Sequence, residues 1–372
     1  MTVAPQLPPD HLRWLQALRE PAQVSQWSLA DWERVVRLGR RLRLLARLTE
    51  RLAAADLLDQ VPPQARRHLV SEQRLSRWRT SAMVWVLERV ATTLHAVDYP
   101  MVLLKGGAYI GQDLPIAKGR LPSDVDILVP KNHIADAQER LRKAGWIEAA
   151  LDEHDQRFYN EWSHEVPPMS HPLHGVELDL HHNIQPPVAR MAVDADLLLQ
   201  RTMPSKWSAW HVLDPLDQVL HSAVHLFQDS DLRDRLRDLV DLDGLMRHFG
   251  AQLPRFWTDL PERANELGLS EPLALACHFC QQWLLTPIPA DAMTQIESAG
   301  PSRLTRAWLL PLLEQVLTPT EPDADPAAAQ SLAATLLLTR HHYGRMPVRL
   351  LIPHTWHKMR ASRKSAESIE AA

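Results

Sequence analysis

The chain has 372 residues, of which 45% are hydrophobic and 23% are charged. These proportions are ordinary for a globular protein of two or three structural units. The formal net charge is −4, so no overall positive field favours binding to nucleic acid. The N-terminus has no basic start followed by an apolar stretch, and no apolar run approaches the roughly 18 residues of a membrane-spanning helix. We therefore expect a cytoplasmic protein without a transmembrane segment.

The first 95 residues are predicted to be helical. Leucines recur at steps of three and four residues, with a break at Pro62-Pro63 and a further helix over about 71–95. One of these helices carries a row of arginines that could bind an anion, although a solvated helix face is the favoured interpretation. The arginines are Arg40, Arg41, Arg43, Arg47 and Arg51.

A glycine turn follows the first predicted strand. The apolar residues 102–104 are predicted to form a buried strand, and Lys105, Gly106 and Gly107 then allow a tight turn before a short helix near Ala108. Glycine lets the backbone approach a ligand closely, so amide groups at this turn would face an anion.

Two carboxylates come next, after a loop that contains Arg120. Asp124 and Asp126 alternate with apolar residues in the segment 123–129, so both side chains project from one face of one strand. Two like charges there repel each other unless a divalent cation lies between them. Their hard oxygen ligands favour Mg²⁺ or Mn²⁺ over zinc.

The region 152–175 contains four histidines among prolines and acids, after an amphipathic helix predicted over 132–144. We expect a substrate-facing loop or hairpin here. A zinc site is the alternative, but the histidine spacings are irregular and no paired ligand motif on one element supports it. The histidines are His154, His164, His171 and His174.

The segment 176–181 alternates again, with Glu177, Asp179 and His181 on its polar face. If this strand lies beside the first acidic strand, one of its acids completes a three-carboxylate cradle for two metal ions. Each acidic segment alone would more often be a half-exposed edge strand with polar residues facing water. Together with the glycine turn, the two segments favour the cradle.

The second half of the chain is predicted to be mostly helical, with helices beginning at Asp214-Pro215 and near Asp229. Residues 318–329 (TPTEPDADPAAA) indicate a linker. The segment 340–364 is rich in Lys and Arg and contains no acid. It could contact an anionic surface weakly, bind nucleic acid, or pack on the acidic body of the protein, which is the favoured interpretation.

The succession of LLKGGA, R-x-x-x-D-x-D-I-L-V at 120–129 and E-L-D-L-H at 177–181 resembles a known family. It is similar to the uncharacterised bacterial nucleotidyltransferases of the DNA polymerase beta-like nucleotidyltransferase superfamily. The likeness extends to helical motifs at 214–225 and 236–241, and it covers about residues 85–250.

The resemblance implies a metal-binding and catalytic pair, Asp124 and Asp126, with Asp179 as the third acid because Asp179 and His181 match the family's acid-x-His pattern. Glu177 would then lie behind the metal ligands. The resemblance also implies that the glycine turn approaches the nucleotide phosphates and that two cations lie near the triphosphate. These nucleotide-binding residues are Lys105, Gly106, Gly107 and Arg120, with supporting roles for Glu177, His181, His225 and Asp241.

We therefore expect an α+β protein with a small mixed β-sheet nucleotidyltransferase core at 96–190. Predominantly helical regions at 1–95 and 191–317 enclose it, and a linker and basic C-terminal segment follow at 318–372. The expected reaction moves a nucleoside monophosphate from an NTP to an unidentified small molecule, RNA or protein. It requires Mg²⁺ (or Mn²⁺) and releases pyrophosphate.

Two alternatives remain open. One is a toxin-type nucleotidyltransferase that acts on tRNA, since such enzymes share the Lys-Gly-Gly and Asp-x-Asp elements. The acid-x-His strand and the helical motifs after it favour the first interpretation. The other is a catalytically silent nucleotide-binding or scaffold protein with the same fold, against which the intact acids argue.

Overall fold

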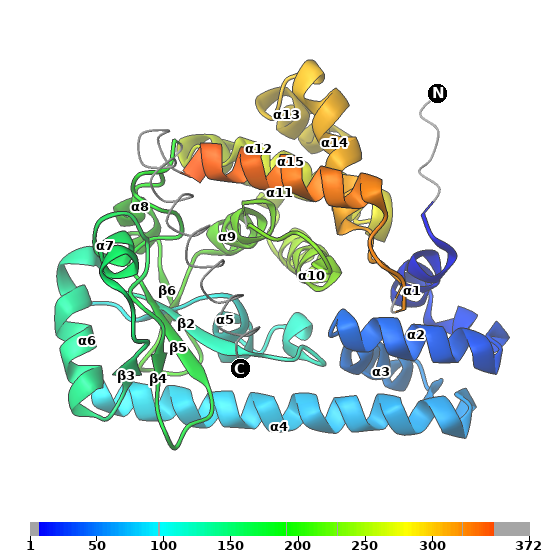
Figure 1. Ribbon diagram of the computed structural model, residues 1–372, viewed down its shortest axis with the longest axis horizontal. Helices are drawn as coiled ribbons and strands as arrows, with labels where there is room; N and C mark the ends of the chain where they lie inside the picture. The colour runs from blue at the N-terminus through cyan, green and yellow to red at the C-terminus, as the bar shows by residue number, and fades with distance from the viewer. Residues whose placement is uncertain (1–6, 96, 191, 229, 322, 346–372) are drawn as a thin grey trace, which may run out of the picture.

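The computed structural model describes residues 7–95, 97–190, 192–228, 230–321 and 323–345 (Figure 1). A mixed β-sheet lies on one side of the molecule, and helices from both ends of the chain surround it. The fold is therefore α+β, as the sequence predicted. The buried apolar side chains form one continuous cluster from Trp14 to Leu337, so the sheet and the helical regions share a core.

One long helix connects the N-terminal helices to the sheet. Helix α2 starts with a reciprocal capping box between Ser28 and Asp31, which satisfies backbone donors at its first turn. Helix α4 is 31 residues long and begins at Pro63, where proline is favourable in a first turn, so the helix starts earlier than the predicted 71–95. Figure 1 shows α4 running beneath both the sheet and helices α2 and α3. The bounds are α1 Pro9–Arg19, α2 Leu29–Arg41, α3 Leu45–Ala54 and α4 Pro63–Thr93.

The sheet has seven strands within the described residues, in the order β3-β4-β5-β2-β1-β7-β6. Its centre is the parallel pair β2 and β5, and β1 lies antiparallel on the other side of β2. Val125, Ile127, Leu178 and Leu180 are fully buried, which anchors both acidic strands by their apolar faces. The strands are β1 Val102–Leu103, β2 Asp124–Leu128, β3 Ile147–Glu148, β4 Met169–Ser170, β5 Glu177–His181, β6 Met203–Pro204 and β7 His211–Val212.

The remaining helices follow the central strands. Helix α9 starts at Pro215 with Asp214 as its cap, and it packs against α10 and α12. The bounds are α5 Lys105–Gly111, α6 Ile134–Lys143, α7 Glu153–Glu161, α8 Ala195–Leu199, α9 Pro215–Phe227, α10 Leu236–Gln252, α11 Phe256–Glu266, α12 Ser270–Leu284, α13 Ala290–Ala299, α14 Arg303–Leu317 and α15 Ala328–Arg345. Short 3₁₀ helices lie at Pro21–Gln26, Leu58–Gln60, Pro115–Ala117 and Lys131–His133.

Two segments differ from the sequence-based expectation, and a third lies outside the described residues. Helix α7 occupies part of the region expected to be a loop or hairpin, because Asp152 caps it through the amide of Asp155. Helix α15 occupies the first part of the expected basic C-terminal segment. The expectations for the basic residues at 346–364 and for the chain end lie outside the described residues.

Strands β6 and β7 come from beyond residue 190, so the sheet draws on both sides of the expected core boundary. The division of the chain at residues 95, 190 and 317 stays a prediction. Within the described part of the chain, no helix combines the length and the apolar character needed to cross a membrane.

Candidate active site

The three predicted acids meet at the centre of the sheet. The parallel register of β2 and β5 places Asp126 opposite Asp179 and Asp124 opposite Glu177. Asp124, Asp126 and Asp179 each offer a carboxylate oxygen, and these oxygens lie within 4.8 Å of one another. The side chain of Glu177 is exposed at the end of β5. The structure thus brings three acids together and leaves the fourth outside the group.

Asp126 is the buried member of this acidic group, and two donors share one of its oxygens. Lys105 Nζ lies 2.8 Å from Asp126 Oδ1, and His181 Nε2 lies 3.2 Å from the same atom. Burial by itself would raise the pKa of Asp126, but Lys105 and His181 hold that pKa well below its ordinary value. Among the described residues both contacts use Oδ1, which leaves Oδ2 for a further ligand.

Asp179 carries the opposite shift. Burial, followed by the negative charge of Asp126, raises the pKa of Asp179 to about 7. The raised pKa of Asp179 shows that a further negative charge beside Asp126 is unfavourable in this buried group. A divalent cation bound by three carboxylates would relieve that repulsion, and oxygen ligands suit Mg²⁺ or Mn²⁺. The donor set fits the predicted metal.

The glycine segment lies in helix α5, which begins at Lys105 and not near Ala108 as predicted. The chain turns at Lys105, whose φ of +43° is unusual for a residue with a side chain. A Cβ on Gly106 would lie 2.5 Å from Arg120 Nη1, whereas a Cβ on Gly107 would make ordinary contact with Leu103 at 3.7 Å. A side chain at position 106 would therefore have to displace the guanidinium of Arg120, which Asp241 holds.

Arg120 belongs to a buried ionic network. Asp241 on α10 accepts a hydrogen bond from Arg120 Nε at 2.7 Å on one oxygen and from Arg47 Nη2 at 2.8 Å on the other. All three side chains are buried. The network joins α3, the loop before β2 and α10, which fixes the path of the chain into Asp124. Both cations predicted near the triphosphate, Lys105 and Arg120, therefore contact carboxylates in this structure.

A pocket of about 210 Å³ opens beside the acids, with Lys105 in its wall. Burial lowers the pKa of His221 to about 3 and that of His225 well below its ordinary value, so both rings are neutral at physiological pH. His225 Nε2 lies 3.0 Å from Arg235. The other ionisable residues of the wall are His164, Glu165 and His181.

Glu165 is a site residue that no sequence motif predicted. Its Oε2 lies 3.3 Å from His181 Nδ1, which is ion-pair distance but not hydrogen-bond geometry. His164, Glu165 and His181 also form a group whose ligand atoms lie within 4.8 Å of one another. Glu165 reaches this place through a β-bridge to His181, a pairing for which the sequence has no local signal.

The histidines of the region 152–175 divide between two places. His171 and His174 stack on each other with ring centroids 3.7 Å apart, and both contact Trp146. His164 lies instead beside His181, with ring centroids 5.5 Å apart. The side chain of His154 is not among those described. The geometry groups His164 with the acidic strands and not with His171 and His174.

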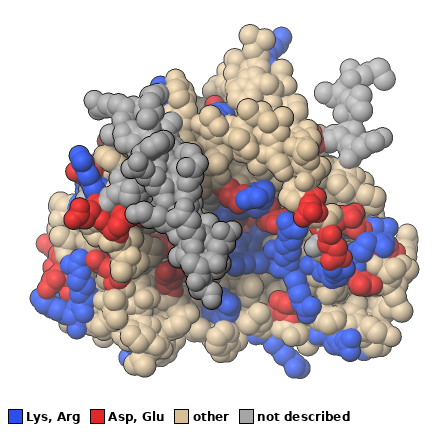
Figure 2. Space-filling view, in the orientation of Figure 1, with Lys and Arg blue, Asp and Glu red and all other residues tan. Residues whose placement is uncertain are grey.

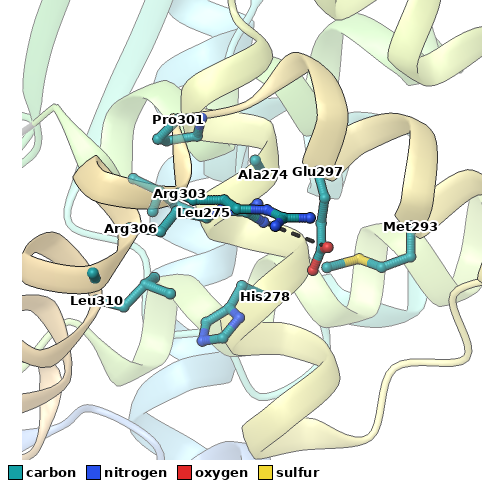
Figure 3. A pocket seen from close by; sticks show the side chains of 10 residues that line it. Ala274, Leu275, His278, Met293, Glu297, Pro301, Arg303, Arg306 and Leu310 are labelled. Carbon is teal, nitrogen blue, oxygen red and sulfur yellow. Dashed lines mark ion pairs between the residues drawn. The ribbon is translucent and has the colours of Figure 1, made fainter.

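A larger pocket of about 310 Å³ lies among helices α12, α13 and α14 (Figure 3). Figure 3 shows Arg306 pointing toward Glu297, and their side-chain atoms are 3.4 Å apart. Glu297 is the one carboxylate among the described residues that line this pocket. Its charge is already paired, so the chemistry of the chain is better placed at the acidic strands.

A family model described as "Uncharacterised nucleotidyltransferase" matches residues 28–285. The match covers more than half of the chain and includes every candidate residue of the acidic site. No curated protein and no solved structure matches the chain significantly. The chain belongs to this uncharacterised nucleotidyltransferase family.

Proposed function

We propose that this member of the uncharacterised nucleotidyltransferase family moves a nucleoside monophosphate from an NTP to an acceptor hydroxyl or phosphate and releases pyrophosphate. The observation that carries the proposal is the register of β2 and β5, which sets Asp126 level with Asp179 and groups both with Asp124. Three carboxylates that hold a divalent cation suit a reaction in which negatively charged phosphates are attacked.

Asp124, Asp126 and Asp179 would hold Mg²⁺ or Mn²⁺. A divalent cation there supplies activation of the attacking oxygen and neutralisation of charge on the leaving pyrophosphate. Lys105 fixes Asp126 from α5, and His181 fixes it from β5. Glu165, on the far side of the His181 ring, favours the orientation in which Nε2 faces Asp126.

Asp179 would position or deprotonate the acceptor. A carboxyl with a pKa near 7 in the free chain is suited to accept a proton near neutral pH. The neighbouring pocket of about 210 Å³ provides space for an acceptor group. The neutral rings of His221 and His225 can donate or accept hydrogen bonds there without adding charge.

The proposal is tested by incubating the purified chain with each NTP, labelled on the α-phosphate, together with Mg²⁺ and a cell lysate. We expect label to enter one class of molecule, and fractionation into small molecules, RNA and protein identifies that class. Label in tRNA would support the toxin-type alternative. Failure of all four nucleotides to transfer label, with Mg²⁺ or with Mn²⁺, would favour a catalytically silent protein.

A further inference from the structure

The nucleotide needs positive partners that the predicted cations do not supply. A triphosphate carries several negative charges, while Lys105 and Arg120 contact Asp126 and Asp241. Figure 2 shows Lys and Arg side chains around a hollow near the middle of the molecule, where α10 faces α2 and α3 in Figure 1. Arg79 contacts the segment that leads into Asp124, and Arg43 interacts electrostatically with Arg79, Arg237 and Asp124. We call Arg43, Arg79 and Arg237 the arginine cluster.

Arg237 contributes to the arginine cluster from helix α10. It lies one turn before Asp241, so it shares the helix face that binds Arg120. Its Nη2 lies 3.4 Å from Asp238 Oδ1, and its buried Nη1 has no hydrogen-bond partner among the described residues. Asp238 is already paired with Arg235 at 2.8 Å. Arg237 therefore carries a buried donor whose hydrogen bond is not made within the described residues.

Arg79 contributes to the arginine cluster from helix α4. Ser76, one turn earlier, donates to the carbonyl of Arg120 at 2.7 Å, and Arg79 Nη1 lies 3.5 Å from the carbonyl of Pro122. These contacts place Arg79 over the segment that enters β2 just before Asp124. The guanidinium contacts Pro122 at the limit of hydrogen-bond distance, and its other donors remain available among the residues that the structure describes.

Arg43 completes the cluster from the turn between α2 and α3. Arg43 is an exposed residue, and its guanidinium has no hydrogen-bond or ion-pair partner in the described parts of the chain. Partial burial of the guanidinium, then the charges of Arg237 and Arg79, lower the pKa of Arg43, while the charges of Asp124 and Asp238 oppose that shift. Arg43 therefore lies within electrostatic range of both other arginines and of the acidic site. Three like charges gathered in this way repel one another in the absence of an anion.

We propose that the arginine cluster binds the polyphosphate of the incoming nucleotide beside Asp124. Guanidinium groups form bidentate hydrogen bonds with phosphate oxygens, and an anion between the three would relieve their mutual repulsion. The proposal rests on the proposed function, since it assigns the NTP triphosphate to the side of the acids that α4 and α10 cover. The pocket with His221 and His225 is then left to the acceptor.

The test measures binding of inorganic tripolyphosphate, with Mg²⁺ present, by calorimetry. This probe has no base or ribose, so it isolates the phosphate contacts. We expect Arg43→Gln, Arg79→Gln and Arg237→Gln each to weaken binding about tenfold or more, the usual effect of losing a charge-assisted hydrogen bond. Each NTP that the protein accepts should displace the probe. Arg40→Gln is the matched control, because Arg40 lies three residues from Arg43 and is paired with Glu72.

Several outcomes would overturn the proposal. These are absence of tripolyphosphate binding by the wild type, equal affinity in the three variants and the control, or failure of every NTP to displace the probe. The last outcome would indicate a site for inorganic polyphosphate. Thermal melting of each variant checks that the fold is kept. Failure of the proposed function is seen separately, because loss of polyphosphate affinity in the arginine variants does not depend on any transfer of label.

Discussion

Asp179 and Glu177 differ in what they face, although they share one side of strand β5. Asp179 is opposite Asp126 and within the acidic group, whereas Glu177 is exposed and opposite Asp124. Asp179→Asn should bind NTP nearly normally and lose on the order of 10²-fold in the chemical step. Glu177→Gln should lose much less. Single-turnover assays compare the two, and the reverse ranking would mean that Glu177 is the catalytic acid.

Gly106 and Gly107 form a matched pair of adjacent glycines on α5. A side chain at position 106 must displace the guanidinium of Arg120, which Asp241 holds, while position 107 has ordinary room. We expect Gly106→Ala to lower the free energy of unfolding by about 1–3 kcal/mol. Gly107→Ala should be neutral or stabilising by up to about 1 kcal/mol, since alanine favours the helix. Urea unfolding decides the matter, and equal effects would refute the packing role of Gly106.

At the residue scale, the sequence predicts which side chains share a strand face but not which distant partner each one meets. The alternation around Asp124 and Asp126 and around Asp179 is local, because strand periodicity puts alternate residues on one side. The partnership of Arg120 with Asp241 joins positions 121 residues apart. The same holds for Arg47. Its prediction on a solvated helix face is wrong, because the side chain is buried against Asp241.

At the scale of elements, Asp241 fixes helix α10 to α3 and to the loop before β2. Asp241→Asn should leave the guanidiniums of Arg47 and Arg120 buried beside a neutral amide. Removing one partner of a buried ion pair typically costs about 3–5 kcal/mol, and here two pairs depend on one carboxylate. Chemical denaturation measures the loss. The control is Asp259→Asn, whose exposed pair with Arg255 should contribute little that can be measured.

If Asp241→Asn and Asp259→Asn proved equally mild, the buried network would not be what holds α10 against the loop before β2.

Elements with long periodic patterns, such as α4 and α9, were predictable from the spacing of leucine and valine. The two-residue strands β6 and β7 were not, because two residues show no alternation. Helix α7 was missed because histidines and prolines around it suggested a loop.

At the scale of the whole molecule, the N-terminal helix α1 is closed against α12 by an aromatic contact. His11 packs edge-on against Trp283 with ring centroids 4.8 Å apart, and neither ring nitrogen of His11 has a hydrogen-bond partner in the described structure. Burial, assisted by the charge of Arg19, lowers the pKa of His11 to about 3 from 6.5. The ring is therefore neutral in the folded chain over the physiological range.

This pKa shift predicts an acid sensitivity with a definite sign. The unfolded chain binds a proton at His11 below about pH 6.5 while the folded chain does not, so stability is lost as pH falls from there toward 3. His11 alone should lower the free energy of unfolding by about 2 kcal/mol between pH 7.5 and pH 5. His11→Phe should abolish that part of the pH dependence. Equal pH slopes for wild type and variant in urea unfolding would contradict the assignment.

The central claim is that the acids of β2 and β5 form one metal-dependent site for nucleotidyl transfer. The most direct measurement is pyrophosphate release and transfer of labelled nucleotide by the purified chain, compared with the double variant Asp124→Asn, Asp126→Asn. We expect the double variant to lose transfer completely and to stay folded with a lower melting temperature, because Asp126→Asn removes the buried partner of Lys105. Undiminished transfer by a folded double variant would contradict the account.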